Sequence, residues 1–472
     1  MQVTCVGIKP TQALVQAQAP VLTPELLAAC GARYSRNGEG LAAILSKVDA
    51  SNEDAAVDSI FRMVDYGHQS IADMVPVAMF VDRISLWLAL RMWLACPTAG
   101  GQESSTRYIE LDAEATVCRE EFIGPAAERQ QLQNQLNACF EAYQRALELW
   151  NTIAARQPSL LRLPASLIES TAPKDKRKVE RICRNFAFDR ARYYLPMSAV
   201  TNVMMLMSAR GWVSLIKQLF SEQLPECRML AERLRGELER VAPRLIRHAR
   251  FDESYAAGAR QEFAYAVTRA QNQPADQLTG PAASQPFLDV MLPRGMRAEE
   301  LVAAVQFHRG RYDFIGSQLQ RTAVRFGWQA LPIAEIRDLN RHRTGSKYFD
   351  LAPVGTYLAD DEIARVAREY ANLADECAAL DKLRSIGSAA TTAAHSQLAA
   401  GNPAFVYWLP MGAQCYYDHT TTANHFLYQA ELRTGLGSHY VYAARMAECL
   451  ELWHQQFPGT AQYVQAGTAE PE

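Results

Sequence analysis

The sequence predicts an α+β protein built from two related units in tandem. The chain has 472 residues, which is long for a single hydrophobic core and suits two domains. Amphipathic helical patterns dominate, and shorter stretches of strand character lie between them. The same order of motifs occurs in both halves, which indicates an internal repeat.

The longest helical pattern begins at Ala126 and ends near Ala154. Its apolar residues recur every three or four positions, as they do on the buried face of a helix. Asp360 and Asp361 can cap another helix that ends near Leu383. Strand-like segments are predicted at residues 1–8, 75–81 and 322–328.

A segment rich in Gln, Pro, Ala, Gly and Ser, residues 271–285, is the best candidate for a linker. It divides the chain into a first unit, residues 1–270, and a second unit, residues 286–472. The first unit contains Arg192-Tyr-Tyr-Leu-Pro-Met, and the second contains Val406-Tyr-Trp-Leu-Pro-Met. In both, an apolar helix, a short polar motif and an amphipathic helix are predicted to follow in the same order, which favours an ancient duplication.

Composition excludes several classes of protein. The net charge is −3, so a basic surplus that would indicate nucleic acid as a partner is missing. The N-terminus has no signal-peptide pattern, and the most apolar segment, residues 84–96, is too short to span a bilayer. The sequence therefore predicts a cytoplasmic protein without a membrane partner.

The ten cysteines are scattered and form no metal-binding pair, so we expect reduced thiols. His419 and His425 could in principle bind a metal. No carboxylate or thiol motif accompanies them, and isolated histidines are usually satisfied locally, so we predict no metal site.

The second unit carries a basic motif, Arg341-His342-Arg343-Thr-Gly-Ser346. Two guanidiniums beside an imidazole suit a phosphate or an electron-rich ring. The alternative is a solvated basic helix end, which the helix dipole favours.

The first unit carries Gly-Gly-Gln-Glu103-Ser-Ser105-Thr-Arg107-Tyr. On an extended segment, Glu103, Ser105 and Arg107 would point to the same side and offer an acceptor, a hydroxyl and a cation to a nucleotide. The alternative is a polar turn before a strand. Upstream, Gly-His68-Gln-Ser70 is either a ligand contact or an ordinary helix end.

Together these motifs resemble the signature of the flavin-dependent thymidylate synthases. That family carries Arg-His-Arg with a Ser, then Glu-x-Ser-x-Arg-Tyr, an upstream Gly-His-x-Ser/Thr, and downstream Arg-x-x-Leu-Pro and Leu-Arg segments. The first unit resembles the signature at residues 67–70, 103–108 and 192–196, and the second at 341–346, 409–410 and 432–433. The resemblance implies that each unit is an antiparallel sheet packed with long helices.

The losses in the two units are complementary. Where Arg-His-Arg is expected, the first unit has Ala95-Cys96-Pro97. Leu219 stands where the family has the arginine of its downstream Leu-Arg segment. The second unit keeps Arg433 but lacks Glu-x-Ser-x-Arg-Tyr, and Val406 stands where the first unit has Arg192. Because the family forms homotetramers with shared active sites, we expect one composite site from both units and a homodimer that forms a pseudo-tetramer.

The resemblance implies FAD-dependent reductive C5-methylation of a uracil nucleotide, dUMP to dTMP. Methylenetetrahydrofolate supplies the carbon, and NADPH regenerates reduced FAD. It implies catalytic or base-contacting roles for Arg433, Glu103 and Ser105, with Ser105 as a ligand group, and substrate binding by Arg107 and Arg192. It also implies a group of residues that bind the flavin and the folate side: Arg341, His342, Arg343, His68, Ser70 and Ser346.

Three other interpretations stay open. The same flavin and folate chemistry could act on another pyrimidine or small-molecule ring, because the residues near the flavin and base depart from the family. The chain could instead be a non-catalytic nucleotide-binding protein on the same fold. In the third, the motifs are a coincidence in a helical scaffold.

Overall fold

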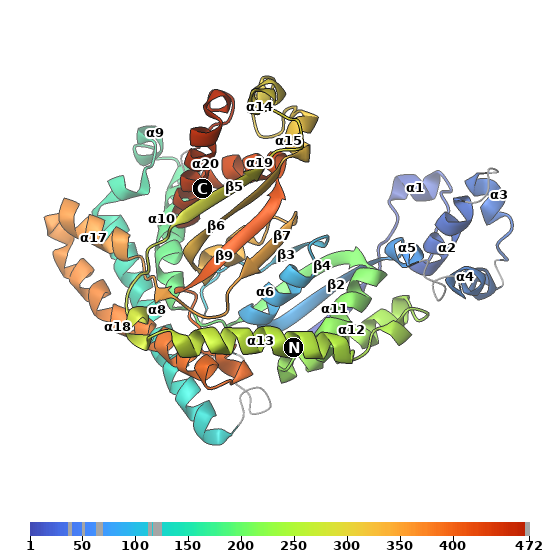
Figure 1. Cartoon of the computed structure of the whole chain (residues 1–472), viewed down its shortest axis with the longest axis horizontal. Coiled ribbons are helices and arrows are strands. Elements are labelled where there is room, and N and C mark those ends of the chain that lie inside the picture. The colour runs from blue at the N-terminus through green and yellow to red at the C-terminus, as the bar shows by residue number, and fades with distance from the viewer. Residues whose placement is uncertain (36–39, 50–51, 63–68, 112–115, 117–124, 468–472) are drawn as a thin grey trace. The chain divides into compact units, whose positions relative to one another are not determined.

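The computed structural model describes residues 1–35, 40–49, 52–62, 69–111, 116 and 125–467 (Figure 1). The chain forms two compact units, which we describe separately. Unit 1 comprises Met1–Ser104 and Val200–Phe263, and unit 2 comprises Ser105–Ala199 and Ala264–Glu472. These compact units do not follow the boundaries predicted at residues 270 and 286. The reason is that long helices of the first half of the chain, residues 1–270, pack with elements of the second half, residues 286–472.

Unit 1 contains a four-stranded antiparallel sheet in the order β1-β2-β4-β3. Its strands are β1 (Gln2–Val6), β2 (Pro76–Ser85), β3 (Gly100–Glu103) and β4 (Val200–Ser208). Val77, Met79 and Val81 alternate along β2 and are buried, as expected for a strand with one face on the core. A β-bulge interrupts the register between Val81 and Ile84.

Helices α11 and α12 pack against the sheet of unit 1. The turn from β2 into α6 is held by α12, because both carboxylate oxygens of buried Glu226 accept hydrogen bonds from Ser85, each of 2.8 Å. The Ser85 hydroxyl also accepts from the Leu88 N–H and caps α6. The helices of unit 1 are α1 (Gln12–Gln16), α2 (Pro24–Tyr34), α3 (Leu41–Leu45), α4 (Glu53–Phe61), α5 (Ser70–Asp73), α6 (Leu86–Ala95), α11 (Ala209–Ser221) and α12 (Pro225–Val241).

Unit 2 contains a second antiparallel sheet in the order β5-β6-β9-β7, with β8 paired to β9. Its strands are β5 (Pro286–Met291), β6 (Ala323–Pro332), β7 (Ser346–Phe349), β8 (Gly355–Thr356) and β9 (Ala413–Thr422). A β-bulge lies between Trp328 and Leu331, the position in β6 that corresponds to the bulge in β2. The predicted α+β class with antiparallel sheets and long helices is confirmed.

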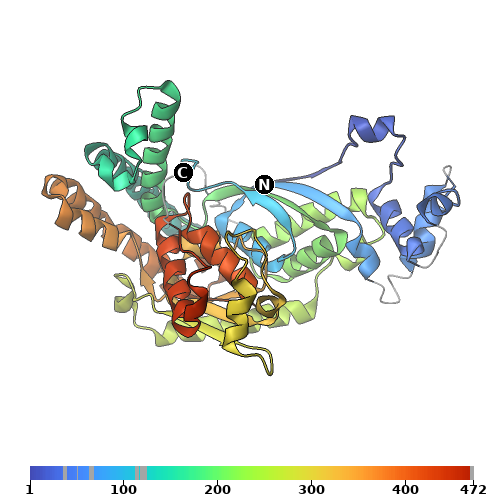
Figure 2. The same ribbon diagram turned by 90° about the horizontal axis from the view of Figure 1, so that it is seen from above.

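Two groups of helices complete unit 2, and in the first α8 packs along α10 and α18 (Figure 1, Figure 2). That group contains α8 (Ala126–Arg156), α9 (Ala165–Ile168), α10 (Pro173–Ala191), α17 (Asp360–Glu369) and α18 (Ala374–Ala399). The second contains α14 (Ala298–Val305), α15 (Ser317–Arg321), α16 (Ile333–Leu339), α19 (Ala423–Thr434) and α20 (Tyr440–Gln456). Helix α13 (Glu253–Asn272) spans the chain position at which unit 1 ends.

Most predicted elements are confirmed, and two predictions are wrong. The apolar helix predicted after each Leu-Pro-Met segment is in fact a strand, β4 in the first case and β9 in the second, because buried residues alternate there with less buried ones. The long helix predicted from Ala126 is α8. The strand-like segment at residues 1–8 contains β1, and the segments at 75–81 and 322–328 overlap the first parts of β2 and β6. The helix predicted from Asp360 to about Leu383 is in fact two helices, because Ala371–Leu373 forms a turn of 3-10 helix that buries Leu373. Two elements therefore stand where one was expected.

Within unit 2, the two Leu-Pro-Met segments pair with each other. The Met197 N–H donates to the Leu409 carbonyl at 2.8 Å, and the Met411 N–H donates to the Leu195 carbonyl at 2.7 Å. Reciprocal contacts of this kind are the mark of two similar segments related by a two-fold axis. This pairing and the shared order of elements support the duplication, which stays a prediction.

Candidate functional site

The predicted site residues are distributed over both compact units. Ser70 and Glu103 belong to unit 1, where Glu103 accepts a hydrogen bond from the Trp93 indole at 3.1 Å. His68 lies outside the described residues. The remaining predicted residues belong to unit 2: Ser105, Arg107, Arg192, Arg341, His342, Arg343, Ser346 and Arg433.

Arg107 is fixed by groups from both halves of the chain. Its Nε and Nη2 donate to the two carboxylate oxygens of Asp189 on α10, at 2.6 and 2.9 Å. Its Nη1 donates to the carbonyl of Gly437 in the second half, at 3.2 Å. The side chain is only 8% exposed. Burial alone would raise the pKa of Asp189, but the charge of Arg107 outweighs it and holds that pKa below its usual range.

Arg192 lies in a 3-10 turn after α10 and has no exposed side-chain surface. Its Nη1 donates to Asp338 at 2.7 Å and its Nη2 donates to Glu335 at 2.9 Å, so a first-half cation is paired with second-half carboxylates. The Tyr193 hydroxyl donates to the same Glu335 oxygen at 3.0 Å. This enclosure argues against substrate binding by Arg192, which stays a prediction, because its guanidinium is already paired with two carboxylates and has no exposed surface.

The Arg-His-Arg motif follows α16 directly, in the loop before β7. Arg341 is 45% exposed and lies 3.8 Å from Asp338, which therefore faces cations from both halves. Burial raises the pKa of Asp338, but the charges of Arg192 and then Arg341 lower it by more, so the pKa lies well below the usual range. Arg343 donates to the Asn340 carbonyl at 2.6 Å.

Arg433 on α19 contacts the histidine of the same motif. Its Nε donates to His342 Nε2 at 2.7 Å, and its guanidinium lies over the Tyr442 ring at 5.4 Å from the centroid. Burial, followed by Arg433, lowers the pKa of His342 well below its ordinary value. His342 is therefore a neutral acceptor, and the charge of Arg433 faces an imidazole and a phenol.

Sequence reasoning missed the partners of these arginines. His439 donates from Nε2 to the Asp189 carbonyl at 3.0 Å and accepts from the Val441 N–H at Nδ1, at 3.2 Å. Burial, then Arg192, lowers its pKa to about 3, so it is neutral. The other missed residues are Asp189, Tyr193, Glu335 and Asp338. The signal for the last two was available, since acidic residues three apart within the apolar segment 333–339 lie on one helix face.

Glu335 gives the site a testable pH dependence. Burial is the largest effect on this carboxyl, and its pKa is raised from 4.5 to about 7. Between these values the native state holds a proton that the unfolded chain has lost, so the free energy of unfolding falls as pH rises. We expect Glu335→Gln to lose less thermal stability than the wild type between pH 5 and pH 8. Melting curves at both pH values test this. The exposed Glu148→Gln is the control, and equal losses in wild type and Glu335→Gln would contradict the assignment.

Strand register identifies the counterparts of the site residues in the other half. The β2–β4 pair Ser85–Val200 corresponds to the β6–β9 pair Pro332–Gln414. Counting from these pairs, the counterparts of Arg341, His342, Arg343 and Arg433 are Leu94, Ala95, Cys96 and Leu219. The strand register thus places the lost Arg-His-Arg at residues 94–96, one residue earlier than the sequence comparison, which places it at residues 95–97.

The strand register also identifies the counterparts of the first-half residues. The counterparts of Glu103, Ser105, Arg107 and Arg192 are Phe349, Leu351, Pro353 and Val406. Each retained set of polar residues thus has an apolar counterpart.

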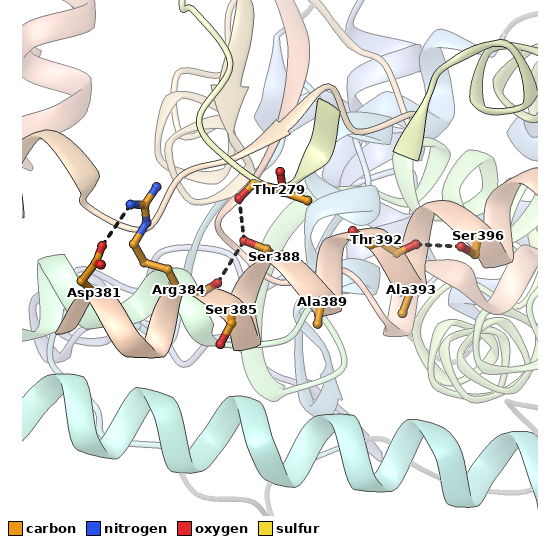
Figure 3. Close-up of a pocket in the computed structure, with 9 residues that line it drawn as sticks. All are labelled: Thr279, Asp381, Arg384, Ser385, Ser388, Ala389, Thr392, Ala393 and Ser396. Carbon is orange, nitrogen blue, oxygen red and sulfur yellow. Dashed lines mark hydrogen bonds and ion pairs between the residues drawn. The ribbon is translucent and has the colours of Figure 1, made fainter. Parts of the chain in front are cut away.

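A separate pocket of about 770 Å³ lies along α18 (Figure 3). Small and hydroxyl side chains line most of it, and its cation, Arg384, is paired with Asp381 at 3.0 Å. The Ser388 hydroxyl donates to the carbonyls of Thr279 and Arg384. No residue predicted for the site lines this pocket, so we place no function in it.

Three further observations concern metal sites and membrane-spanning helices. Among the residues that the structure describes, no three His, Cys, Asp or Glu side chains gather in a metal-binding cluster. His419 is buried and its Nε2 lies 2.7 Å from the Thr344 carbonyl. Within the described ranges, no helix combines the length and apolar character that a membrane span requires.

Comparison with known proteins gives one family match. Residues 20–244 match the family model of the thymidylate synthase complementing protein, Thy1. UPF0159 protein Ta1429 from Thermoplasma acidophilum is 25% identical over 236 residues, which are 45% of this chain and 46% of that protein. The match thus spans about half the length of this relative.

Two solved structures are also similar. One is the flavin-dependent thymidylate synthase ThyX from Helicobacter pylori, complexed with FAD and dUMP, at 15% identity and a TM-score of 0.28. The match covers 50% of this chain and 93% of the ThyX chain. The other is the UMP/dUMP methylase PolB from Streptomyces cacaoi, bound with 5-Br dUMP, at 17% identity and a TM-score of 0.31. The match covers 52% of this chain and 93% of the PolB chain.

Proposed function

Since the chain belongs to the thymidylate synthase complementing protein family through residues 20–244, we propose that it catalyses the flavin-dependent reductive methylation of a uracil ring. One observation carries the proposal. Arg107 donates to the Gly437 carbonyl, and Arg192 donates to Asp338, which also lies 3.8 Å from Arg341. These contacts between residues of the two halves within unit 2 support the proposal of a composite site.

The proposed reaction replaces the hydrogen at C5 of the ring by a methyl group. Methylenetetrahydrofolate supplies the carbon, reduced FAD supplies a hydride, NADPH reduces the FAD again, and the C5 hydrogen leaves as a proton. The protein then has to bind and orient these molecules and to stabilise charge. For the acceptor, dUMP is what the family resemblance implies, and another pyrimidine or ring is the second candidate.

We assign the stabilisation of charge to Arg433. A guanidinium near the pyrimidine stabilises negative charge that develops on a ring carbonyl, and this raises the nucleophilicity of C5. The contact with neutral His342 uses the Nε–H of Arg433 and fixes the orientation of the guanidinium without cancelling its charge. Arg433 therefore keeps the property that this role requires.

The residues beside Arg433 suit the diphosphate and flavin of FAD. Arg341 and Arg343, on the loop that joins α16 to β7, supply charged donors, and Ser346, the first residue of β7, supplies a hydroxyl. In the described part of the chain, the buried Asn340 amide nitrogen has no hydrogen-bond partner. A ligand that accepts from it would remove the cost of this unpaired donor. The roles of Glu103, Ser105, His68 and Ser70 stay predictions, as do the homodimer, the cytoplasmic location and the use of folate and NADPH.

The first test is the visible spectrum of the purified chain after FAD is added and the excess is removed. We expect a bound-flavin spectrum with one FAD per chain, because the counterparts of Arg341 and Arg343 are apolar. Arg341→Ala should weaken FAD binding by about tenfold or more, since it removes a charge-assisted donor. Arg145→Ala, an exposed arginine on α8, is the matched control.

The second step is an assay with FAD, NADPH and methylenetetrahydrofolate, in which mass spectrometry detects an added methyl group on dUMP or on other uracil compounds. A colourless protein that cannot retain FAD would contradict the proposal. A flavin-binding protein that methylates no uracil compound would instead favour the second candidate with a different ring.

A further inference from the structure

The charges of the buried cluster around Arg107 and Arg192 cancel. The two guanidiniums are paired with Asp189, Asp338 and Glu335, which all belong to this chain. Asp189 and Asp338 are ionised, because the pKa of each is held below its usual range, and Glu335 is partly ionised at neutral pH. The cluster as a whole thus offers no surplus of positive charge to a ligand.

The geometry leaves these arginines unable to receive a phosphate. Arg192 has no exposed side-chain surface, and three N–H groups of Arg107 already donate to Asp189 and Gly437. A phosphate on Arg107 would have to displace the Asp189 carboxylate. Asp189 is itself buried, so it would be left as an ionised group in the interior without a cation.

Arg433 differs from both. Its contacts in the described part of the chain are with neutral His342 and with the Tyr442 hydroxyl and ring. Its charge is therefore available for a single, delocalised negative charge of the kind that forms on a ring carbonyl. Of the other cations nearby, Arg341 and Arg343 lie on the loop that the proposed function assigns to FAD, which brings its own diphosphate, and Lys347 donates to the Thr344 carbonyl at 3.3 Å.

From this distribution of charge we infer that the methyl acceptor is a uracil-type ring that carries no phosphate, such as a nucleoside or a neutral conjugate. The inference rests on the proposed function and decides between its two acceptors. The specificity-determining residues are then the three carboxylates, Asp189, Glu335 and Asp338. They neutralise the two arginines and leave a hydrogen-bonded cluster without net positive charge. The ring would be recognised by Arg433, and the rest of the acceptor by uncharged contacts.

The test compares deoxyuridine with dUMP, which differ only in the phosphate. Both are titrated into the FAD-loaded full chain by calorimetry, and methyl transfer to each is followed by mass spectrometry. We expect deoxyuridine to bind within tenfold of dUMP or more tightly. A preference for dUMP of tenfold or more would overturn the inference and leave the proposed function intact. If the FAD-loaded chain binds neither compound, the uracil acceptor of the proposed function is wrong, and the inference fails with it.

Two variants test the cause of the selectivity. Asp189→Asn leaves Arg107 without its counter-charge, and it should increase the affinity for dUMP relative to deoxyuridine by at least tenfold. Glu335→Gln is nearly isosteric, keeps its contacts with Arg192 and Tyr193, and serves if Asp189→Asn fails to fold. Its expected shift has the same direction and is smaller, because Glu335 is only partly ionised at neutral pH. Glu148→Gln, on the exposed face of α8, should leave the ratio unchanged. If neither variant shifts the ratio, neutralisation by carboxylates is not its cause, and the inference fails.

Discussion

Replacement of Arg433 by alanine is expected to lower the rate of methyl transfer by about 100- to 1000-fold, the usual effect of removing one group that stabilises charge in a transition state. The loss should appear in kcat, because the charge on the ring develops only during the reaction. The fold should survive, since Arg433 is partly exposed and its partners, His342 and Tyr442, are not left as buried charges. Steady-state kinetics with saturating cofactors measure the effect.

Arg145→Ala is the matched control, because Arg145 is an exposed arginine whose ion pair with Glu148 lies on the surface of α8. Both variants should bind FAD and melt within a few degrees of the wild type. A kcat of Arg433→Ala within a few-fold of the wild type would contradict the catalytic role. Arg433→Lys adds a further comparison, since lysine keeps the charge and loses the planar guanidinium that contacts His342.

Much of the fold could be predicted from local patterns. The helices α8, α12 and α20 follow from apolar residues at helical spacing, and the strands β1, β2 and β6 follow from short segments of β-branched and aromatic residues. The break between α17 and α18 could not be predicted in this way, because the helical pattern continues through Tyr370 while the chain makes a 3-10 turn. The division into compact units was also beyond local patterns, because it depends on which long helices pack together.

The site shows the same limit more sharply. Arg107, Arg192 and Arg433 were identified from their motifs, but the environment of each could not be deduced. Motif matching shows which cation is present and gives no information on whether a carboxylate from elsewhere in the chain neutralises it. Asp189 lies 82 residues from Arg107, and Glu335 lies 143 residues from Arg192, so these pairs form only through the tertiary fold. The difference between Arg192 and Arg433 therefore emerges from the structure alone.

The buried ion pairs of Arg192 lead to the largest expected effect on stability. Arg192→Leu would leave the carboxylates of Glu335 and Asp338 in the interior without the cation that both contact. Removing one partner of a buried ion pair costs about 3–5 kcal/mol. We expect a loss of unfolding free energy of this size, measured by urea denaturation and followed by circular dichroism.

The other half of the chain indicates the appropriate control. There, Val406 stands at the counterpart of Arg192 and Leu88 at the counterpart of Glu335, so this fold accepts apolar side chains at these positions when no carboxylate is left unpaired. The combined variant Arg192→Leu, Glu335→Leu, Asp338→Asn should therefore recover at least half of the loss, because it removes the unpaired charges together with the cation. If the combined variant is less stable than Arg192→Leu alone, the cost comes from lost packing and not from unpaired charge. Glu335 and Asp338 would then stabilise the fold through the packing of their side chains. Their negative charges would serve the specificity of the site and not its stability.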